Sequence, residues 1–291
     1  MEKRPNKLRT ISELLNEGKT LLEQKGIPNA ELDVQLIMAD ALNCNRLKLI
    51  MRFHETIDLH IEKEYSRKLV QRLARIPVDY ILGKKEFMGF DFMLEDTVLI
   101  PRPETEILVE EAVKLIHNQN ISTVMEIGVG SGNIAVSIAK LSNCKHVTGI
   151  DVSKEAVRIA KENARINKVR EKVTFDCIDL FSPEFSNLPK YDLIVSNPPY
   201  IAEREFNDLQ PEIFYEPRQA LDGGVDGLIF YEYIAATAKE HLNKNGYIVL
   251  EIGYNQLKSV KRIFENNKYC IYKVIEDYSG YHRVLVVRWV K

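Results

Sequence analysis

From residue 122 onward, short apolar runs alternate regularly with segments of helical periodicity, and this alternation constrains the fold more than any other feature. Expected strands cover 123–127, 146–150, 172–177, 191–196 and 247–252, and expected helices cover 133–141, 154–167, 227–242 and 256–267. Such alternation is typical of an α/β domain with a doubly wound, mostly parallel sheet. A final pair of strands, 270–276 and 283–290, is joined through Asp277-Tyr-Ser-Gly280 and predicts an antiparallel hairpin edge. Together these runs predict a seven-stranded sheet.

The chain ahead of this domain has a different character. Residues 1–76 carry apolar side chains at helical spacing and predict a small N-terminal helical bundle. Pro77 ends that pattern, and the aromatic, short-period segment with Gly89 at a turn predicts a β-hairpin linker over 77–97. The α/β domain then occupies 98–291. The bundle either docks another protein or only caps the α/β domain, and its sequence does not choose between these roles.

Composition narrows the function classes. The net charge is −2, and the sequence lacks the strongly basic stripe that is typical of a nucleic-acid-binding protein. No run approaches the roughly 18 apolar residues of a membrane span, and the N-terminal residues lack the apolar core of a signal peptide. The four cysteines and six histidines are scattered without metal-ligand spacing. We therefore expect a cytoplasmic protein with reduced thiols, no metal and no membrane contact.

A glycine-rich turn, Glu126-Ile-Gly128-Val-Gly130-Ser-Gly132-Asn133, joins the first strand of the alternating region to its helix. Glycines allow a ligand close to the backbone, and a helix N-terminus adds N–H donors. Asn133 stands where the dinucleotide fingerprint requires its third glycine, and Gly-x-Gly-x-Gly is the spacing of sheets that bind S-adenosylmethionine. The predicted cofactor-binding residues here are Glu126, Gly128, Val129, Gly130, Ser131 and Gly132. A tight strand–helix turn without a ligand is the alternative.

Carboxylates follow the next two strands. Asp151 ends the second strand, where a carboxylate accepts hydrogen bonds from ribose hydroxyls in nucleotide folds. Asp179 ends the third strand, where an acceptor would meet an adenine amino group between Leu180 and Phe181. Separately, Asp151 could be a helix N-cap in competition with Ser153, and Asp179 a turn residue. Their occurrence at successive strand ends favours a cofactor site.

The fourth strand ends in Asn197-Pro198-Pro199-Tyr200. Two prolines fix the backbone and remove two N–H donors, so their carbonyls remain acceptors. The Asn197 side-chain oxygen and the Pro198 carbonyl can together hold both hydrogens of a planar –NH2 group, and the Tyr200 ring can cover its face. We expect this tetrapeptide to bind the substrate, with Asn197, Pro198 and Tyr200 as catalytic residues and Asn197 also near the cofactor. A proline-rich turn is the alternative.

Several further segments carry a family resemblance. They are Pro77-Val-Asp-Tyr-Ile-Leu-Gly-Lys-Lys-Glu-Phe-Met-Gly89, Val98-Leu-Ile-Pro-Arg-Pro-Glu-Thr-Glu106, Tyr215-Glu-Pro-Arg218, Gly223-Gly-Val-Asp-Gly227 and Glu251-Ile-Gly-Tyr-Asn-Gln256. With the glycine turn, Asp151 and the Asn-Pro-Pro-Tyr motif, they follow one another as in the HemK/PrmC-type N5-glutamine methyltransferases, which the chain resembles over nearly its whole length. Glu126 and Val129 depart from that family, which usually has Asp and commonly Thr at these places.

The resemblance implies a class I methyltransferase fold and methyl transfer from S-adenosylmethionine, with S-adenosylhomocysteine as product. The implied substrate is the side-chain N5 of the glutamine in the Gly-Gly-Gln loop of class-1 peptide chain release factors. Two alternatives stay open. One is an N-methyltransferase acting on exocyclic amino groups of nucleic-acid bases, which shares the clamp. The other is a non-catalytic module that binds S-adenosylmethionine or a protein.

Other residues of these segments have two interpretations. Arg102, Thr105 and Glu106 either border the active-site mouth or only form a helix start with Pro103 at its first position. The segments 215–218 and 223–227 either shape the substrate lip or supply turns. Asp277 and Arg283 are expected to be structural.

Overall fold

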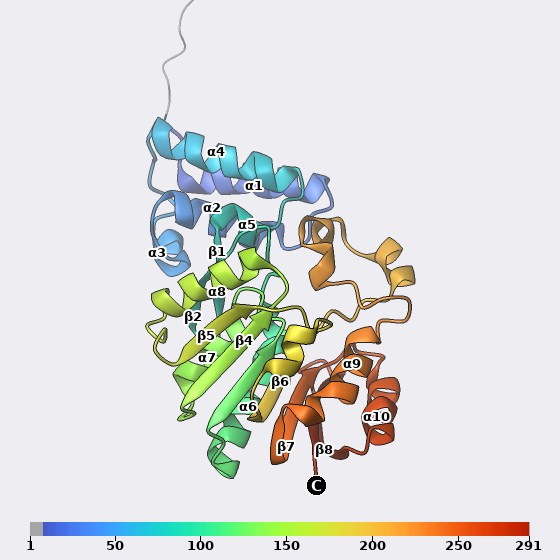
Figure 1. The fold of residues 1–291 in the computed structure, drawn as a ribbon. Coiled ribbons are helices and arrows are strands. Elements are labelled where there is room, and N and C mark those ends of the chain that lie inside the picture. Colours follow the sequence, from blue (N-terminus) through green and yellow to red (C-terminus); the bar gives the residue numbers. More distant parts are fainter. Residues whose placement is uncertain (1–7, 291) are drawn as a thin grey trace, which may run out of the picture. The chain divides into compact units, whose positions relative to one another are not determined.

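The structure is a computed structural model that describes residues 8–290. The chain divides into two compact units after Gly83 (Figure 1). The first unit is helical and consists of α1 (Ile11–Gln24), α2 (Ala30–Ala41), α3 (Arg46–Met51), α4 (Leu59–Leu73) and α5 (Val78–Leu82). It confirms the predicted helical N-terminal region. The three-part division with a linker over 77–97 stays a prediction.

Local sequence signals account for most of these helices. Thr10 caps α1 in a capping box with Glu13, and Asp58 caps α4 by accepting from two backbone N–H groups. The core between the helices is apolar, and Gly18 of α1 leaves room for the Tyr65 hydroxyl of α4. Two short helices were not predicted. Asn45 caps α3, and α5 lies where the sequence predicted only a hairpin.

The second unit contains a separate hairpin and a seven-stranded sheet. Its hairpin pairs β1 (Lys84–Phe87) with β2 (Phe90–Met93), as the turn at Gly89 predicted. The sheet strands are β3 (Thr123–Ile127), β4 (His146–Asp151), β5 (Val173–Cys177), β6 (Tyr191–Ser196), β7 (Leu242–Glu251), β8 (Cys270–Glu276) and β9 (His282–Arg288). Their order is β5-β4-β3-β6-β7-β9-β8, with β9 antiparallel to both of its neighbours. The predicted sheet with an antiparallel C-terminal edge is confirmed.

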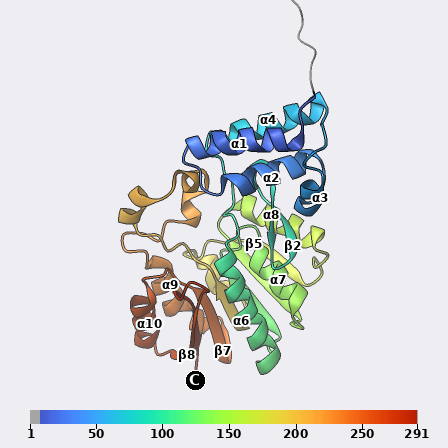
Figure 2. The same cartoon turned by 180° about the vertical axis from the view of Figure 1, so that it is seen from behind.

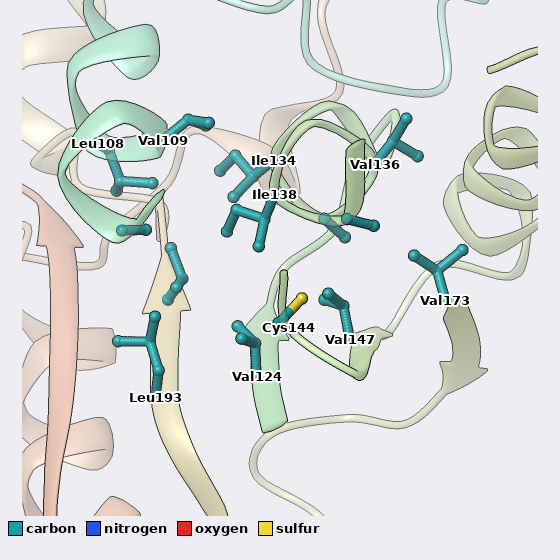
Figure 3. Close-up of a cluster of buried hydrophobic side chains, with 14 of the residues drawn as sticks. Leu108, Val109, Val124, Ile134, Val136, Ile138, Cys144, Val147, Val173 and Leu193 are labelled. Atoms are coloured by element: carbon teal, nitrogen blue, oxygen red, sulfur yellow. The ribbon is translucent and has the colours of Figure 1, made fainter. Parts of the chain in front are cut away.

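Helices cover both faces of this sheet (Figure 1 and Figure 2). One face packs against α6 (Pro103–Gln119), α7 (Asn133–Leu141) and α8 (Lys154–Ile166), and the other against α9 (Ile229–Thr237) and α10 (Leu257–Asn266). Figure 3 shows apolar side chains of α6, α7 and the neighbouring strands converging in the first of these layers. Because both faces are buried, the central strands are almost continuously apolar, which made them recognisable in the sequence.

The winding of the sheet determines where a ligand can bind. From β3 the chain passes through α7 and α8 to one edge, then crosses to β6 and continues to β7. The strand order therefore reverses between β3 and β6, and ligands bind beyond the carboxyl ends of the strands at such a switch point. Among residues 8–290, no helix has the length and apolar character needed to cross a membrane.

Candidate active site

A cavity opens at this switch point, within the second unit. It spans about 1020 Å³, including the solvent-open space at its mouth. Residues that follow β3, β4, β5 and β6 line it, together with segments 97–102 and 217–220. The predicted cofactor residues found in the lining are Gly128, Val129, Gly130, Ser131, Asp151, Asp179, Leu180 and Asn197.

The glycine turn lies directly under the cavity. Gly130 has a φ of +51°, and a side chain there would enter open space rather than protein, so the backbone itself faces the ligand. Gly132 is not in the lining of this cavity and packs closely on α8, where an added Cβ would lie 2.9 Å from the Cβ of Ala160. The Val129 side chain is buried against Gly149. The turn therefore presents backbone to the cavity and anchors itself through Val129 and Gly132.

Asp151 faces the cavity from the end of β4. Its Oδ2 accepts from Gly130 N at 3.0 Å and its Oδ1 from Ser153 N at 2.9 Å. A carboxylate oxygen accepts more than one hydrogen bond, so the Asp151 side chain can also accept from a ribose diol in the cavity. Burial raises the pKa of Asp151, and the bonds from the backbone amides oppose this shift. The helix cap is Ser153, whose hydroxyl accepts from Ala156 N, so Asp151 is not needed for that role.

The far end of the cavity is apolar with one carboxylate. Asp179 and Leu180 line it after β5, together with Phe230 of α9. Phe181 is not part of this lining; its ring packs at a tilt against Phe230 and edge-on against Tyr233, at ring-centroid distances of 5.4 and 4.7 Å. Phe181 thus supports the Phe230 ring, and the direct contact predicted for it with an adenine ring stays a prediction.

Glu126 lies beneath the cavity rather than in its lining. It is fully buried, and its Oε2 accepts from Ala135 N in the first turn of α7 at 2.9 Å. Its Oε1 is buried without a hydrogen-bond partner. Burial raises the pKa of Glu126 well above the ordinary range, and the nearby Asp151 charge raises it further. A direct contact between Glu126 and the cofactor therefore stays a prediction.

The groups that line the cavity fit S-adenosylmethionine. The glycine turn leaves open space above its backbone, Asp151 presents a carboxylate, and Leu180 with Phe230 provides an apolar slot beside Asp179. These three parts match an amino-acid tail, a ribose and a purine, in that order along the strand ends.

The Asn-Pro-Pro-Tyr turn is held rigidly at the end of β6. Ser196 donates its hydroxyl to Ile127 O at 2.7 Å, and Gln256 Nε2 donates to Tyr200 O at 2.9 Å. The 223–227 segment packs on the same backbone, since an added Cβ at Gly227 would lie only 2.3 Å from Tyr200 O. This segment therefore supports the turn and is more than a surface loop.

Gly227→Ala is expected to destabilise the protein and lower its activity together. The added methyl meets Tyr200 O, and the φ of +77° disfavours any side chain. Gly280→Ala is the matched control, because its φ is +83° but nothing lies within 4 Å. The free energy of unfolding of the control should fall by only about 1–2 kcal/mol, the cost of a left-handed backbone at a residue with a side chain. Urea unfolding measures both variants, and equal losses would show that the contact with Tyr200 is unimportant.

A second cavity adjoins the first and shares its wall. It encloses about 470 Å³ and is lined by Tyr200 and Ile213, while Asn197, Pro198 and Arg102 line both cavities. Asn197 and Pro198 thus stand between two adjoining spaces, which suits a group that binds an acceptor on one side and a methyl donor on the other.

Segment 98–106 both starts a helix and borders this site. Pro103 is the first residue of α6, as the helix-start interpretation predicts. Arg102 forms an ion pair with Glu216, whose other oxygen accepts from Ile100 N at 3.1 Å. Glu106 does not line either cavity and instead accepts from Met88 N at 2.6 Å. Glu216 therefore ties the 215–218 segment to the cavity wall.

Two polar residues complete the wall behind Asn197. Asn197 Nδ2 donates to Thr105 Oγ1 at 3.2 Å. Thr105 Oγ1 donates in turn to Glu251 Oε2 at 2.6 Å, and both residues are buried. Sequence reasoning gave Thr105 two possible roles and gave Glu251 none. It also missed the lining residues Val152, Ile178, Gln219 and Phe230. The sequence held a signal only for Val152 and Ile178, which are adjacent to Asp151 and Asp179.

Comparison with known proteins identifies the two units. The PrmC N-terminal domain family matches residues 13–83, and the methyltransferase small domain family matches residues 104–276. A release factor glutamine methyltransferase of Geobacter sulfurreducens is 40% identical over 278 residues, covering 95% of this chain and 95% of that protein. One of Fusobacterium nucleatum is 39% identical over 278 residues, covering 95% of this chain and 78% of that protein.

A solved structure agrees on the fold. A methyltransferase of Pyrococcus furiosus has a TM-score of 0.52 at 19% identity, covering 76% of this chain and 99% of that chain. The chain is a methyltransferase, and its methyl donor is S-adenosylmethionine. It belongs to the release factor glutamine methyltransferase family.

Proposed function

We propose that this enzyme methylates the side-chain N5 of the glutamine in the Gly-Gly-Gln loop of class-1 peptide chain release factors. Family membership supports release factors as substrate. The observation that carries the chemistry is the position of Asn197 and Pro198 in the wall shared by the two cavities. A glutamine side chain entering the smaller cavity would meet both acceptors.

The clamp explains how a poor nucleophile is used. The lone pair of an amide nitrogen is delocalised into its carbonyl. When bound, S-adenosylmethionine supplies an electrophilic sulfonium methyl. Asn197 Oδ1 and the Pro198 carbonyl accept hydrogen bonds from the two N–H groups of the glutamine amide. These bonds fix the nitrogen and stabilise the positive charge that develops on it in the transition state. Such positioning contributes up to about 7–11 kcal/mol of barrier reduction.

Tyr200 and the surrounding backbone complete the proposed acceptor site. Tyr200 lines the smaller cavity, where its ring would cover the amide plane of the glutamine. Burial raises the pKa of its hydroxyl, so Tyr200 stays neutral. Methyl transfer would release S-adenosylhomocysteine and leave the glutamine nitrogen cationic. That nitrogen then loses a proton to water and becomes neutral, so no general base is assigned.

The overall charge favours a protein over a nucleic acid as acceptor. The net charge of −2 supplies no excess of positive charge for phosphates. An exocyclic amino group of a base would fit the same clamp, so the clamp does not distinguish a glutamine from a base. The charge balance and the family membership are what support a protein substrate. A release factor as substrate also implies that the enzyme acts in the cytoplasm.

Cells with and without this protein provide the test. Release factor purified from each is digested, and the peptide containing the Gly-Gly-Gln loop is weighed by mass spectrometry. We expect the glutamine to carry one methyl group only when the protein is present. The same methylation in both strains would overturn the proposal.

A further inference from the structure

We propose that Thr105 and Glu251 are positioning residues that fix which end of the Asn197 amide faces the substrate. The inference rests on the proposed glutamine clamp and concerns residues outside it. Thr105 is the third residue of α6, Glu251 ends β7, and Asn197 follows β6. Three elements thus bring one hydrogen-bonded chain together at the cavity wall, where Thr105 and Asn197 both line the larger cavity.

The direction of each hydrogen bond follows from the end of this chain. An ionised carboxylate only accepts hydrogen bonds, and a hydroxyl has one proton to donate. Thr105 Oγ1 lies 2.6 Å from Glu251 Oε2, so its proton points to Glu251. Only the lone pairs of Thr105 Oγ1 remain for Asn197, so Asn197 must present its donor Nδ2, which lies 3.2 Å from Thr105 Oγ1. The Oδ1 of Asn197 is then left to face the cavities.

The opposite orientation would disable the clamp. The two ends of an Asn amide have nearly the same shape, so packing alone selects weakly between them. With Nδ2 toward the cavities, Asn197 would offer a donor to the glutamine –NH2, which is itself a donor. The Glu251 carboxylate fixes the direction of the Thr105 hydrogen bond, and Thr105 in turn fixes the orientation of the Asn197 amide. The substrate therefore always meets the acceptor end of Asn197.

The surroundings of Glu251 make its ionisation state adjustable. It is 1% exposed, and burial raises its pKa to about 7 while the Thr105 hydrogen bond and the Arg283 charge oppose the shift. The other charged or titratable groups that face it are Arg102 and Glu104 beside the start of α6, Tyr200 after β6, and Tyr231 of α9. When Glu251 gains a proton it becomes a donor, and the direction of the chain is no longer fixed.

Thr105 variants test the positioning role. Thr105→Val keeps the shape and removes the hydroxyl, so kcat should fall about 10-fold or more while the Kd for S-adenosylmethionine stays within about 3-fold. Thr105→Ser should restore most of the activity. Thr174→Val is the matched control, because Thr174 is exposed on β5 and its hydroxyl contacts only His146. Equal losses in Thr105→Val and Thr105→Ser, or no loss in either, would contradict the proposal.

The pH profile tests Glu251. Wild-type kcat should fall as the pH drops through about 7, because the carboxylate that fixes the chain is lost there. Glu251→Gln offers both a donor and an acceptor at every pH, so its kcat should be lower and flat across this range. Its melting temperature at pH 8 should not fall, since the variant removes a buried charge. A variant with wild-type kcat and an unchanged profile would overturn the assignment.

A spectroscopic signal separates this inference from the proposed function. The side-chain amide nitrogen of Asn197 can be followed by NMR in the full chain without any substrate. Its chemical shift should titrate with the pKa of Glu251 in the wild type and not in Glu251→Gln. Absence of this titration contradicts the positioning chain, whereas its presence in a protein that does not methylate release factor contradicts only the proposed function.

Discussion

Asn197→Ala is expected to lower kcat about 100- to 1,000-fold, the usual loss when one transition-state hydrogen bond of this kind is removed. The side-chain oxygen of Asn197 is one of only two acceptors proposed for the glutamine nitrogen, and Pro198 alone cannot orient it. The Kd for S-adenosylmethionine should change only a few-fold, because the glycine turn and Asp151 remain intact. Single-turnover kinetics and calorimetry separate the two effects.

Asn266→Ala serves as the matched control for this variant. Asn266 is an exposed residue at the end of α10 and lines neither cavity. It should retain wild-type kcat. Turnover near the wild-type value in Asn197→Ala would show that the acceptor nitrogen is held by other groups.

Asp151→Ala should weaken S-adenosylmethionine binding about 100-fold, or about 3 kcal/mol, through the loss of two hydrogen bonds to a charged acceptor. The carboxylate also accepts from Gly130 N and Ser153 N, so its removal loosens the turn beneath the cavity. With saturating S-adenosylmethionine, kcat should recover most of its value, since the clamp lies on another strand.

Isothermal titration calorimetry with S-adenosylmethionine measures this loss. Asp176→Ala is the control, because Asp176 is an exposed carboxylate of the neighbouring strand β5 and does not line the cavity. Its Kd should match that of the wild type. An Asp151→Ala variant with unchanged affinity would remove Asp151 from the cofactor site.

The strands and their functional ends could be predicted from the sequence. Strands such as β3 and β6 are buried on both faces, so their apolar runs are unmistakable and end abruptly at polar or glycine residues. Parallel strands place those ends along one edge, so the sequence alone predicts that Gly130, Asp151 and Asn197 lie close together. The cavity that they line agrees with that expectation.

Contacts between distant segments could not be predicted in the same way. Thr105 is 92 residues from Asn197 and 146 from Glu251, and a helix start explains Thr105 equally well from sequence alone. Short 3₁₀ turns between residues 203 and 220 carry no periodic pattern, so the wall of the smaller cavity was not foreseen. The Glu126 side chain accepts a hydrogen bond from Ala135 N in α7, which its position in the glycine motif does not predict.

The most direct test of the central claim is methylation in vitro. Purified enzyme and S-adenosylmethionine labelled in its methyl group are incubated separately with a class-1 release factor, tRNA and duplex DNA, and the label is located by tandem mass spectrometry. We expect label only in the release factor, on the glutamine of the Gly-Gly-Gln loop. Label in either nucleic acid, or a release factor that stays unlabelled, would contradict the proposed function.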